Sequence, residues 1–187
     1  LAVNDAVGAT FVGGGAVVVA AGPSRRMAGV DKLMAEIGGG PVLAWTLEPC
    51  AAAPCVGRVV LVAAPDRADE WRSAPWLPAC VTGVVEGGAS RGQSAAAGVR
   101  WLDAQDPAGR DRPVLVHDGA RPLVSPDLVA SVAGAAWHHG AALPVLQVAE
   151  TLKRVTDGLV LETVDRSTLA AAQTPQGARR GLLLDAW

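Results

Sequence analysis

The sequence contains no tyrosine, a single phenylalanine and only three cysteines among its 187 residues. Cys50, Cys55 and Cys80 form no C-x-x-C pair and leave an odd number, which argues against a disulfide framework and against a zinc site. This cysteine content favours reduced thiols, and it predicts a cytoplasmic protein.

Charge of one sign and long apolar runs are also scarce. The formal net charge is only −2, so a site for anions must come from a local cluster of cations rather than from the whole surface. The apolar run near the start falls far below the roughly 18 residues of a membrane helix. The residues before it hold Asp5 and no cation, unlike a signal peptide. We therefore expect no nucleic-acid partner and no membrane association, and we expect a small anionic ligand.

Residues 1–15 show no sustained period and end in three glycines, which predicts a flexible leader or a tail left from cloning. A single domain is expected over residues 16–187, because short β-rich runs alternate there with longer helical patterns. The predicted strands are 16–20, 58–63, 81–85, 113–117 and 141–146. The predicted helices are 42–53, 66–72, 91–104 and 126–139. The fold class is therefore α/β, with an open, mostly parallel, Rossmann-like sheet that carries helices on both faces.

The helix starts carry recognisable signals. Pro41 suits a first helical turn, and Asp66, Ser90 and Ser125 are predicted N-caps. Further along, two β-like runs at 150–155 and 159–164 flank an Asp-Gly turn, which predicts a protruding β-hairpin arm near residues 149–168. An isolated hairpin is marginal in water, so this arm is expected to pack on a second subunit.

The most informative stretch is residues 20–32, where a strand runs into a glycine-opened loop that carries Arg25, Arg26 and Lys32. Successive backbone N–H groups in such a turn form an anion site, to which these cations add full charges. A triphosphate is the expected ligand of this loop. The stretch fits neither G-x-G-x-x-G nor G-x-x-x-x-G-K-[ST], and an ordinary surface turn is the alternative reading.

A second loop, residues 117–122, follows the predicted strand 113–117. The carboxyl ends of parallel strands are where open α/β sheets bind ligands, and Asp118 there is the predicted ligand of Mg²⁺. The alternative is an aspartate that only caps a turn, but the nearby Arg121 suits a phosphate. His117 is interpreted as a strand-end residue satisfied by backbone rather than as a general base.

A third loop, residues 87–94, opens the predicted helix 91–104. Gly87 and Gly88 permit close approach to a flat ligand, while Arg91 and Ser94 offer donors from the first helical turn. The alternative is a glycine turn followed by a capped helix.

Taken together, these residues resemble the 2-C-methyl-D-erythritol 4-phosphate cytidylyltransferases over residues 16 to about 180. The motifs that occur in the same order and spacing are Ala20-Ala21-Gly22, Arg25-Arg26-Met27 with Lys32, Gly87-Gly88 with Arg91 and Ser94, residues 117–122, residues 150–153, residues 163–166 and residues 173–176.

The resemblance implies a nucleotidyltransferase fold and a homodimeric enzyme. It implies that CTP and methylerythritol phosphate, a small phosphorylated polyol, react with Mg²⁺ present and release pyrophosphate in non-mevalonate isoprenoid biosynthesis. It also implies a role for each matching residue. Arg26 and Lys32 would be catalytic; Ala20, Ala21, Gly22, Gly88, Arg91 and Ser94 would bind the nucleotide; Asp118 would bind the metal; and Arg121, Thr151, Lys153, Arg166 and Thr174 would bind the acceptor, with Arg166 reaching across the dimer.

The chemistry agrees with this reading, because an acceptor phosphate is already a nucleophile and needs positioning and charge neutralisation rather than a general base. Some positions depart from the family pattern. Asp31 stands where proline is usual and Ala89 where a polar residue is usual, and the family continues beyond Trp187 with an Asn and a Lys near the active site. Either the sequence is incomplete at this end or that charge is missing, and in the second case we expect impaired turnover. Two alternatives therefore stay open, a sister transferase that uses another alditol or sugar phosphate and a catalytically silent nucleotide-binding protein.

Overall fold

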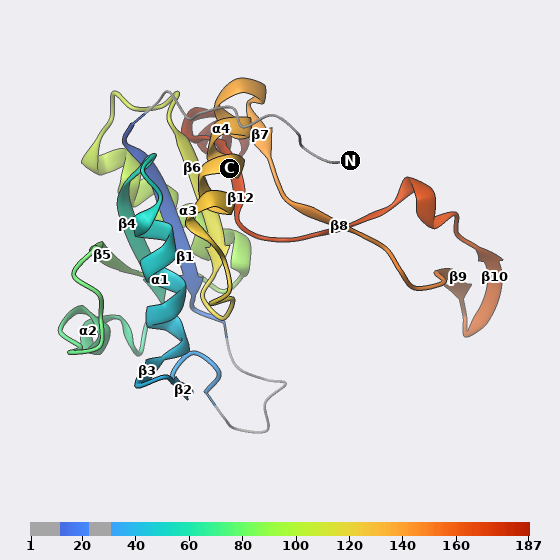
Figure 1. The fold of residues 1–187 in the computed structure, drawn as a ribbon, viewed down its shortest axis with the longest axis horizontal. Helices are drawn as coiled ribbons and strands as arrows, with labels where there is room; N and C mark the ends of the chain where they lie inside the picture. The colour runs from blue at the N-terminus through green and yellow to red at the C-terminus, as the bar shows by residue number, and fades with distance from the viewer. Residues whose placement is uncertain (1–11, 23–30) are drawn as a thin grey trace.

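The computed structural model describes residues 12–22 and 31–187, and its centre is a six-stranded sheet in the order β5-β4-β1-β6-β12-β7 (Figure 1). The strands are β1 (Gly14–Ala20), β4 (Val56–Ala63), β5 (Val81–Glu86), β6 (Pro113–Asp118), β7 (Ala141–Ala142) and β12 (Gln176–Arg179). The first four strands in this order are parallel, and β12 runs antiparallel to both β6 and β7. The predicted open, mostly parallel sheet is therefore confirmed.

Helices cover both faces of this sheet, as the uninterrupted valine and leucine runs indicated. The helices are α1 (Val42–Ala52), α2 (Ala68–Arg72), α3 (Arg91–Gln105), α4 (Pro126–His139) and α5 (Arg180–Ala186). In β1, Ala16 and Val18 pack in one core with α1, α2 and α4, while Val17 packs in a second core with α3 and α5. Successive strand residues point to opposite faces, so one short strand supplies both cores.

The predicted helices agree with the observed ones to within two residues, and two of the three predicted N-caps are confirmed. The side chains of Ser90 and Ser125 accept hydrogen bonds from backbone N–H groups of the first helical turn, each at 3.2 Å. Asp66 is not a cap, because α2 begins two residues later, after Arg67, with no side-chain cap. Pro41 lies just outside α1, in the short hairpin of β2 (Glu36–Ile37) and β3 (Gly40–Pro41).

The predicted strand 141–146 is wrong. The chain leaves the central sheet after β7, and Leu143-Pro144 separates β7 from β8 (Val145–Gln147). Proline has no N–H with which to continue a ladder, so the strand breaks there. β8 instead pairs with β11 (Ala170–Ala172), outside the central sheet.

The predicted hairpin is confirmed. β9 (Lys153–Thr156) pairs antiparallel with β10 (Leu159–Thr163), and both turn residues have positive φ, 50° at Asp157 and 79° at Gly158. Such a turn matches the twist of the strands it joins. We call residues 143–175 the arm, with β8 and β11 as its stalk. Between β10 and β11 lies the short helix η1 (Arg166–Thr168), and Figure 1 shows the whole arm projecting from the body.

No helix within residues 12–22 and 31–187 is long and apolar enough to cross a membrane. The predicted leader falls largely outside the described residues, but Gly14 and Gly15 already belong to β1.

Candidate active site

A cavity of about 460 Å³ lies at the carboxyl ends of β1, β5 and β6, where the three predicted loops meet. It is lined by Val19, Ala20, Ala21, Gly22, Lys32, Leu33, Gly88, Ala89, Ser90, Arg91, Ser94, Asp118, Gly119, Ala120 and Arg121. All six predicted nucleotide-binding residues lie here, together with Lys32, Asp118 and Arg121. The structure thus brings together nine of the predicted site residues at the ligand-binding edge of a parallel sheet.

The loop after β5 lies directly against the end of β1, and only glycine fits at Gly87. A Cβ there would stand 2.4 Å from the Cβ of Ala21 and 2.7 Å from Oγ of Ser94. Ser94 is buried, and its hydroxyl accepts from the N–H of Gly88 at 3.1 Å and lies 3.0 Å from the carbonyl oxygen of Ser90. The hydroxyl of Ser94 therefore shapes the glycine loop that lines the cavity.

Two buried side chains form hydrogen bonds with the backbone of the loop after β6. Nε2 of His117 lies 3.1 Å from the carbonyl oxygen of Arg121, and the hydroxyl of Thr46 in α1 lies 2.9 Å from that of Gly119. Desolvation lowers the pKa of His117, so its ring stays neutral near pH 7. This arrangement agrees with the interpretation of His117 as a residue satisfied by backbone, and it fixes the position of Asp118 and Arg121.

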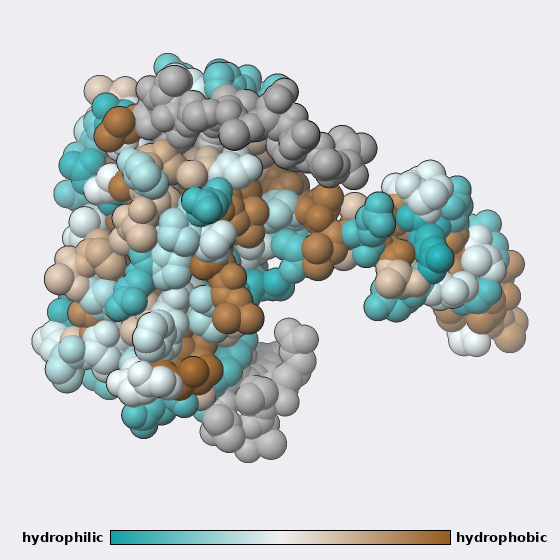
Figure 2. Space-filling view, in the orientation of Figure 1, coloured by the Kyte–Doolittle hydropathy of each residue, from teal (hydrophilic) through white to brown (hydrophobic). Residues whose placement is uncertain are grey.

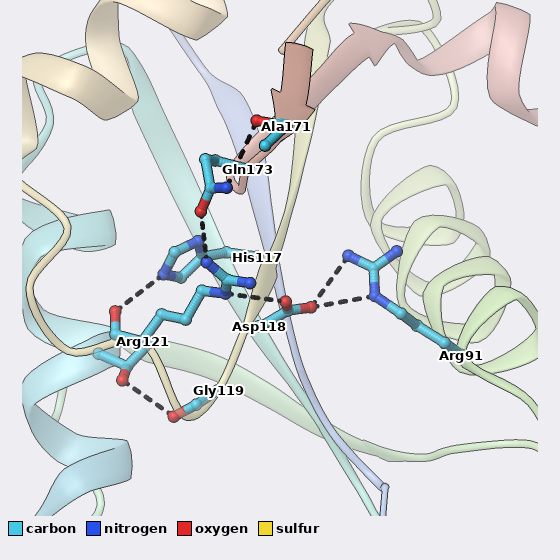
Figure 3. A network of polar contacts seen from close by, with 8 residues as sticks. Arg91, His117, Asp118, Gly119, Arg121, Ala171 and Gln173 are labelled. Atoms are coloured by element: carbon cyan, nitrogen blue, oxygen red, sulfur yellow. Dashed lines mark hydrogen bonds and ion pairs between the residues drawn. The ribbon is translucent and has the colours of Figure 1, made fainter. Parts of the chain in front are cut away.

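Two guanidinium groups surround the carboxylate of Asp118 (Figure 3). Nε of Arg91 donates to Oδ1 at 3.0 Å, and Nε of Arg121 donates to Oδ2 at 3.1 Å. Nη1 of Arg121 also donates to Oε1 of Gln173 at 2.7 Å. Two cations against one carboxylate leave net positive charge at the cavity wall, which suits an anion.

Sequence reasoning missed Gln173 in this network. It belongs to the motif at residues 173–176, in which only Thr174 was predicted to bind the acceptor. Nothing in the sequence links Gln173 to Arg121, which lies 52 residues earlier.

Asp118 is suited to the predicted role of metal ligand, because it lines the cavity. Among the residues that the structure describes, no group of three or more His, Cys, Asp and Glu side chains could hold a metal ion. Mg²⁺ is commonly held by one or two carboxylates together with substrate phosphates and water, so a single carboxylate on the cavity wall is sufficient. The two arginines that bind Asp118 are equally suited to the phosphates that would arrive with the metal.

Lys32 lines the cavity, but the neighbouring Asp31 does not. The carboxylate of Asp31 forms an ion pair with Arg67 and accepts a hydrogen bond from the N–H of Leu33 at 3.0 Å. The charge of Asp31 is therefore compensated by Arg67. Arg26, the other predicted catalytic residue, lies outside the described residues.

The remaining predicted acceptor residues do not line the cavity. Thr151, Lys153 and Arg166 belong to the arm; Nζ of Lys153 donates to Oγ1 of Thr163 at 2.6 Å, and Arg166 donates to the carbonyl oxygen of Ala149. Thr174 lies at the foot of the arm, and its buried Oγ1 has no hydrogen-bond partner within the described residues. The three residues of the arm therefore do not line the cavity beside Asp118 within a single chain.

Comparison with known proteins gives a consistent result. The family model for IspD, 2-C-methyl-D-erythritol 4-phosphate cytidylyltransferase, matches residues 15–187. An enzyme of that name from Cereibacter sphaeroides is 41% identical over 172 residues, which cover 91% of this chain and 75% of the relative. The bifunctional enzyme IspD/IspF of Rhodospirillum rubrum is also 41% identical over 172 residues, but the chain spans only 44% of its length.

The solved structures agree. The crystal structure of the 4-diphosphocytidyl-2C-methyl-D-erythritol synthase of Anaerococcus prevotii matches with a TM-score of 0.75 and 27% identity, covering 91% of this chain and 73% of that one. Two of these findings come from the sequence: the family model matches nearly the whole chain, and a single-function relative is 41% identical. The cavity at the edge of the sheet is an independent structural observation that agrees with them. On this evidence the chain belongs to the 2-C-methyl-D-erythritol 4-phosphate cytidylyltransferase family.

Proposed function

We propose that the chain transfers the cytidylyl group of CTP to 2-C-methyl-D-erythritol 4-phosphate and releases pyrophosphate, as a step of non-mevalonate isoprenoid biosynthesis. The observation that carries this proposal is the cavity in which Lys32, Arg91, Asp118 and Arg121 come together from three loops. The names of the relatives supply the nucleotide and the acceptor.

In this reaction an oxygen of the acceptor phosphate attacks the α-phosphorus of CTP, a new P–O bond forms, and the bond to the β-phosphate oxygen breaks, so that the electron pair leaves with pyrophosphate. No proton has to be removed, which is why a neutral, buried His117 is no obstacle. Lys32 and Arg91 line the cavity, and we assign to them the stabilisation of charge on the triphosphate; we assign the same role to Arg26 from the family resemblance. Mg²⁺ bound at Asp118 would neutralise phosphate charge and align the triphosphate.

The base and ribose of CTP would occupy the part of the cavity walled by Ala20, Ala21 and the glycine loop at Gly88. Small side chains and backbone there allow a flat ring to lie close to the polypeptide. Arg121 would hold the acceptor phosphate, because it lines the cavity and is bonded to Gln173 at the foot of the arm.

We further propose that the arm joins two chains into a homodimer and supplies Thr151, Lys153 and Arg166 to the acceptor site of the second copy. Large apolar side chains of the arm are 40% to 70% exposed: Leu143, Val145, Leu146, Val155, Leu159, Val160, Leu161 and Leu169. Figure 2 shows apolar surface on the projecting arm, including its tip. Such a surface on a thin projection calls for a covering partner. The three free thiols suit a reducing compartment, so we place the enzyme in the cytoplasm.

The test is a pyrophosphate-release assay with CTP, Mg²⁺ and methylerythritol phosphate, with mass detection of the CDP-linked product and a chelator as control. Release with ribitol phosphate or a sugar phosphate, and none with methylerythritol phosphate, would identify a sister transferase. Calorimetric CTP binding without any turnover would identify a silent nucleotide-binding protein. Either result refutes the proposed reaction.

A further inference from the structure

We propose that Gln173 is a positioning residue that fixes the guanidinium of Arg121 and thereby connects the foot of the arm to the active site. Nη1 of Arg121 donates to Oε1 of Gln173 at 2.7 Å, while Nε donates to Asp118 at 3.1 Å. Two acceptors from different elements thus hold one planar group, as Figure 3 shows. The proposal rests on the proposed function, in which Arg121 binds the acceptor phosphate.

Gln173 stands at the point where the arm returns to the body. Its N–H donates to the carbonyl oxygen of Pro144 at 2.9 Å, so it closes the stalk beside the residue from which the chain leaves. Its side-chain Nε2 points to the carbonyl oxygen of Ala171 in β11, at 3.4 Å. The side-chain amide that binds Arg121 is therefore oriented by the stalk.

The consequence concerns the long side chain of Arg121, which without Gln173 would be held by Asp118 alone. The side chain of Arg121 is 48% exposed, and ordering such a side chain opposes ligand binding. The bond to Gln173 orders it before the acceptor arrives. Because Asp118 is in turn bound to Arg91, a displacement of the stalk reaches the nucleotide side of the cavity through three successive contacts.

The first experiment uses Gln173→Met, which keeps the length of the side chain and removes its acceptor oxygen. Hydrogen bonds to charged groups are among the stronger ones, so we expect KM for the acceptor to rise about tenfold. KM for CTP should change much less, because the contact between Arg91 and Asp118 remains, and the melting temperature should stay close to that of the wild type. Gln105→Met is the matched control, because Gln105 is exposed at the end of α3, away from the network. An unchanged KM for the acceptor in Gln173→Met overturns the proposal.

A double-mutant cycle separates positioning from a direct role. If Gln173 acts through Arg121, Gln173→Met has no further effect on kcat/KM in an Arg121→Met background. Equal losses in both backgrounds would show that Gln173 acts on its own, and would refute the inference.

A second readout needs no activity. In ¹⁵N NMR spectra, the Nη1–H signal of Arg121, assigned by its loss in Arg121→Met, should shift in Gln173→Met, because Nη1 donates to Oε1 of Gln173. It should stay in place in Gln105→Met and near its place in Gln173→Glu, which retains an acceptor oxygen. No shift in Gln173→Met overturns the inference whether or not the protein is active. If the signal shifts in Gln173→Met but the wild-type protein releases no pyrophosphate, the proposed function alone is refuted.

Discussion

If the arm completes the acceptor site of a second copy, two variants that are each impaired should restore each other's activity. Lys32→Ala removes a cation from the cavity of the body, and Arg166→Ala removes one from the arm. In a dimer with one chain of each kind, the first site combines both defects. The second site combines an intact Lys32 with an intact Arg166.

The size of the effect follows from this arrangement. Random pairing of equal amounts makes half of all dimers mixed, and each mixed dimer holds one intact site out of two, so about a quarter of wild-type activity should return. Each variant alone should fall about 10- to 100-fold, since each loses a charged contact to phosphate. A quarter of full activity therefore stands clearly above either parent.

The assay is pyrophosphate release before and after subunit exchange, repeated on mixed dimers isolated by two different tags. The control mixes Arg166→Ala with Lys153→Ala. Both changes lie on the arm, so no mixed dimer has an intact site, and activity should stay low. Activity of the Lys32→Ala and Arg166→Ala mixture that stays at the average of its parents would show that Arg166 acts within its own chain, or not at all.

Four further changes test single features of the site and the core. Lys32→Ala should lower kcat more than it raises KM for CTP, because its charge matters most in the transition state; steady-state kinetics that show only a KM effect contradict this role. Gly87→Ala should lower the melting temperature and weaken CTP binding measured by calorimetry, since its Cβ would meet the end of β1 at 2.4 Å, whereas Gly92→Ala, with its nearest neighbour at 3.9 Å, should be tolerated. His117 is buried with a pKa lowered from 6.5, so the unfolded chain takes up a proton that the folded chain does not. The free energy of unfolding should therefore decline as pH falls below 6.5, and urea titrations of His117→Gln should show a flatter decline. Arg180→Met should cost about 1–3 kcal/mol in urea unfolding, because the 4%-exposed Arg180 pairs with Asp103 and donates to the carbonyl oxygens of Leu102 and Asp106, whereas the carboxylate of Asp106 keeps its pair with Arg112; a loss under about 0.5 kcal/mol would contradict this account.

The parallel core and its loops follow from local signals in the sequence. Runs such as residues 59–62 are apolar at every position, and only a strand covered on both faces buries all of them. The loops after β1, β5 and β6 begin with glycine or with charged residues at the ends of such runs. Because the ends of parallel strands meet at one edge of the sheet, the sequence predicts a common site there, and nine predicted residues do line one cavity.

The contacts that join distant parts of the chain were not predictable in this way. β12 contains Gly177 and Ala178, which carry no strand pattern. It is a strand because its backbone pairs with β6 on one side and with β7 on the other. The pairing of Arg121 with Gln173 depends on how the arm folds back, which no local periodicity encodes. The compensation of Asp31 by Arg67 likewise spans 36 residues.

The pairing of β7 with β12 has a consequence for how this enzyme could be divided. Ala142 and Gly177 face each other across the ladder, so the chain departs and re-enters at adjacent points although 34 residues lie between them. A tight turn of a few residues could bridge this gap without disturbing either hydrophobic layer. The projecting segment is thus built as a detachable insert, and its length and sequence can be varied, or exchanged between relatives, while the catalytic half of the molecule keeps its architecture.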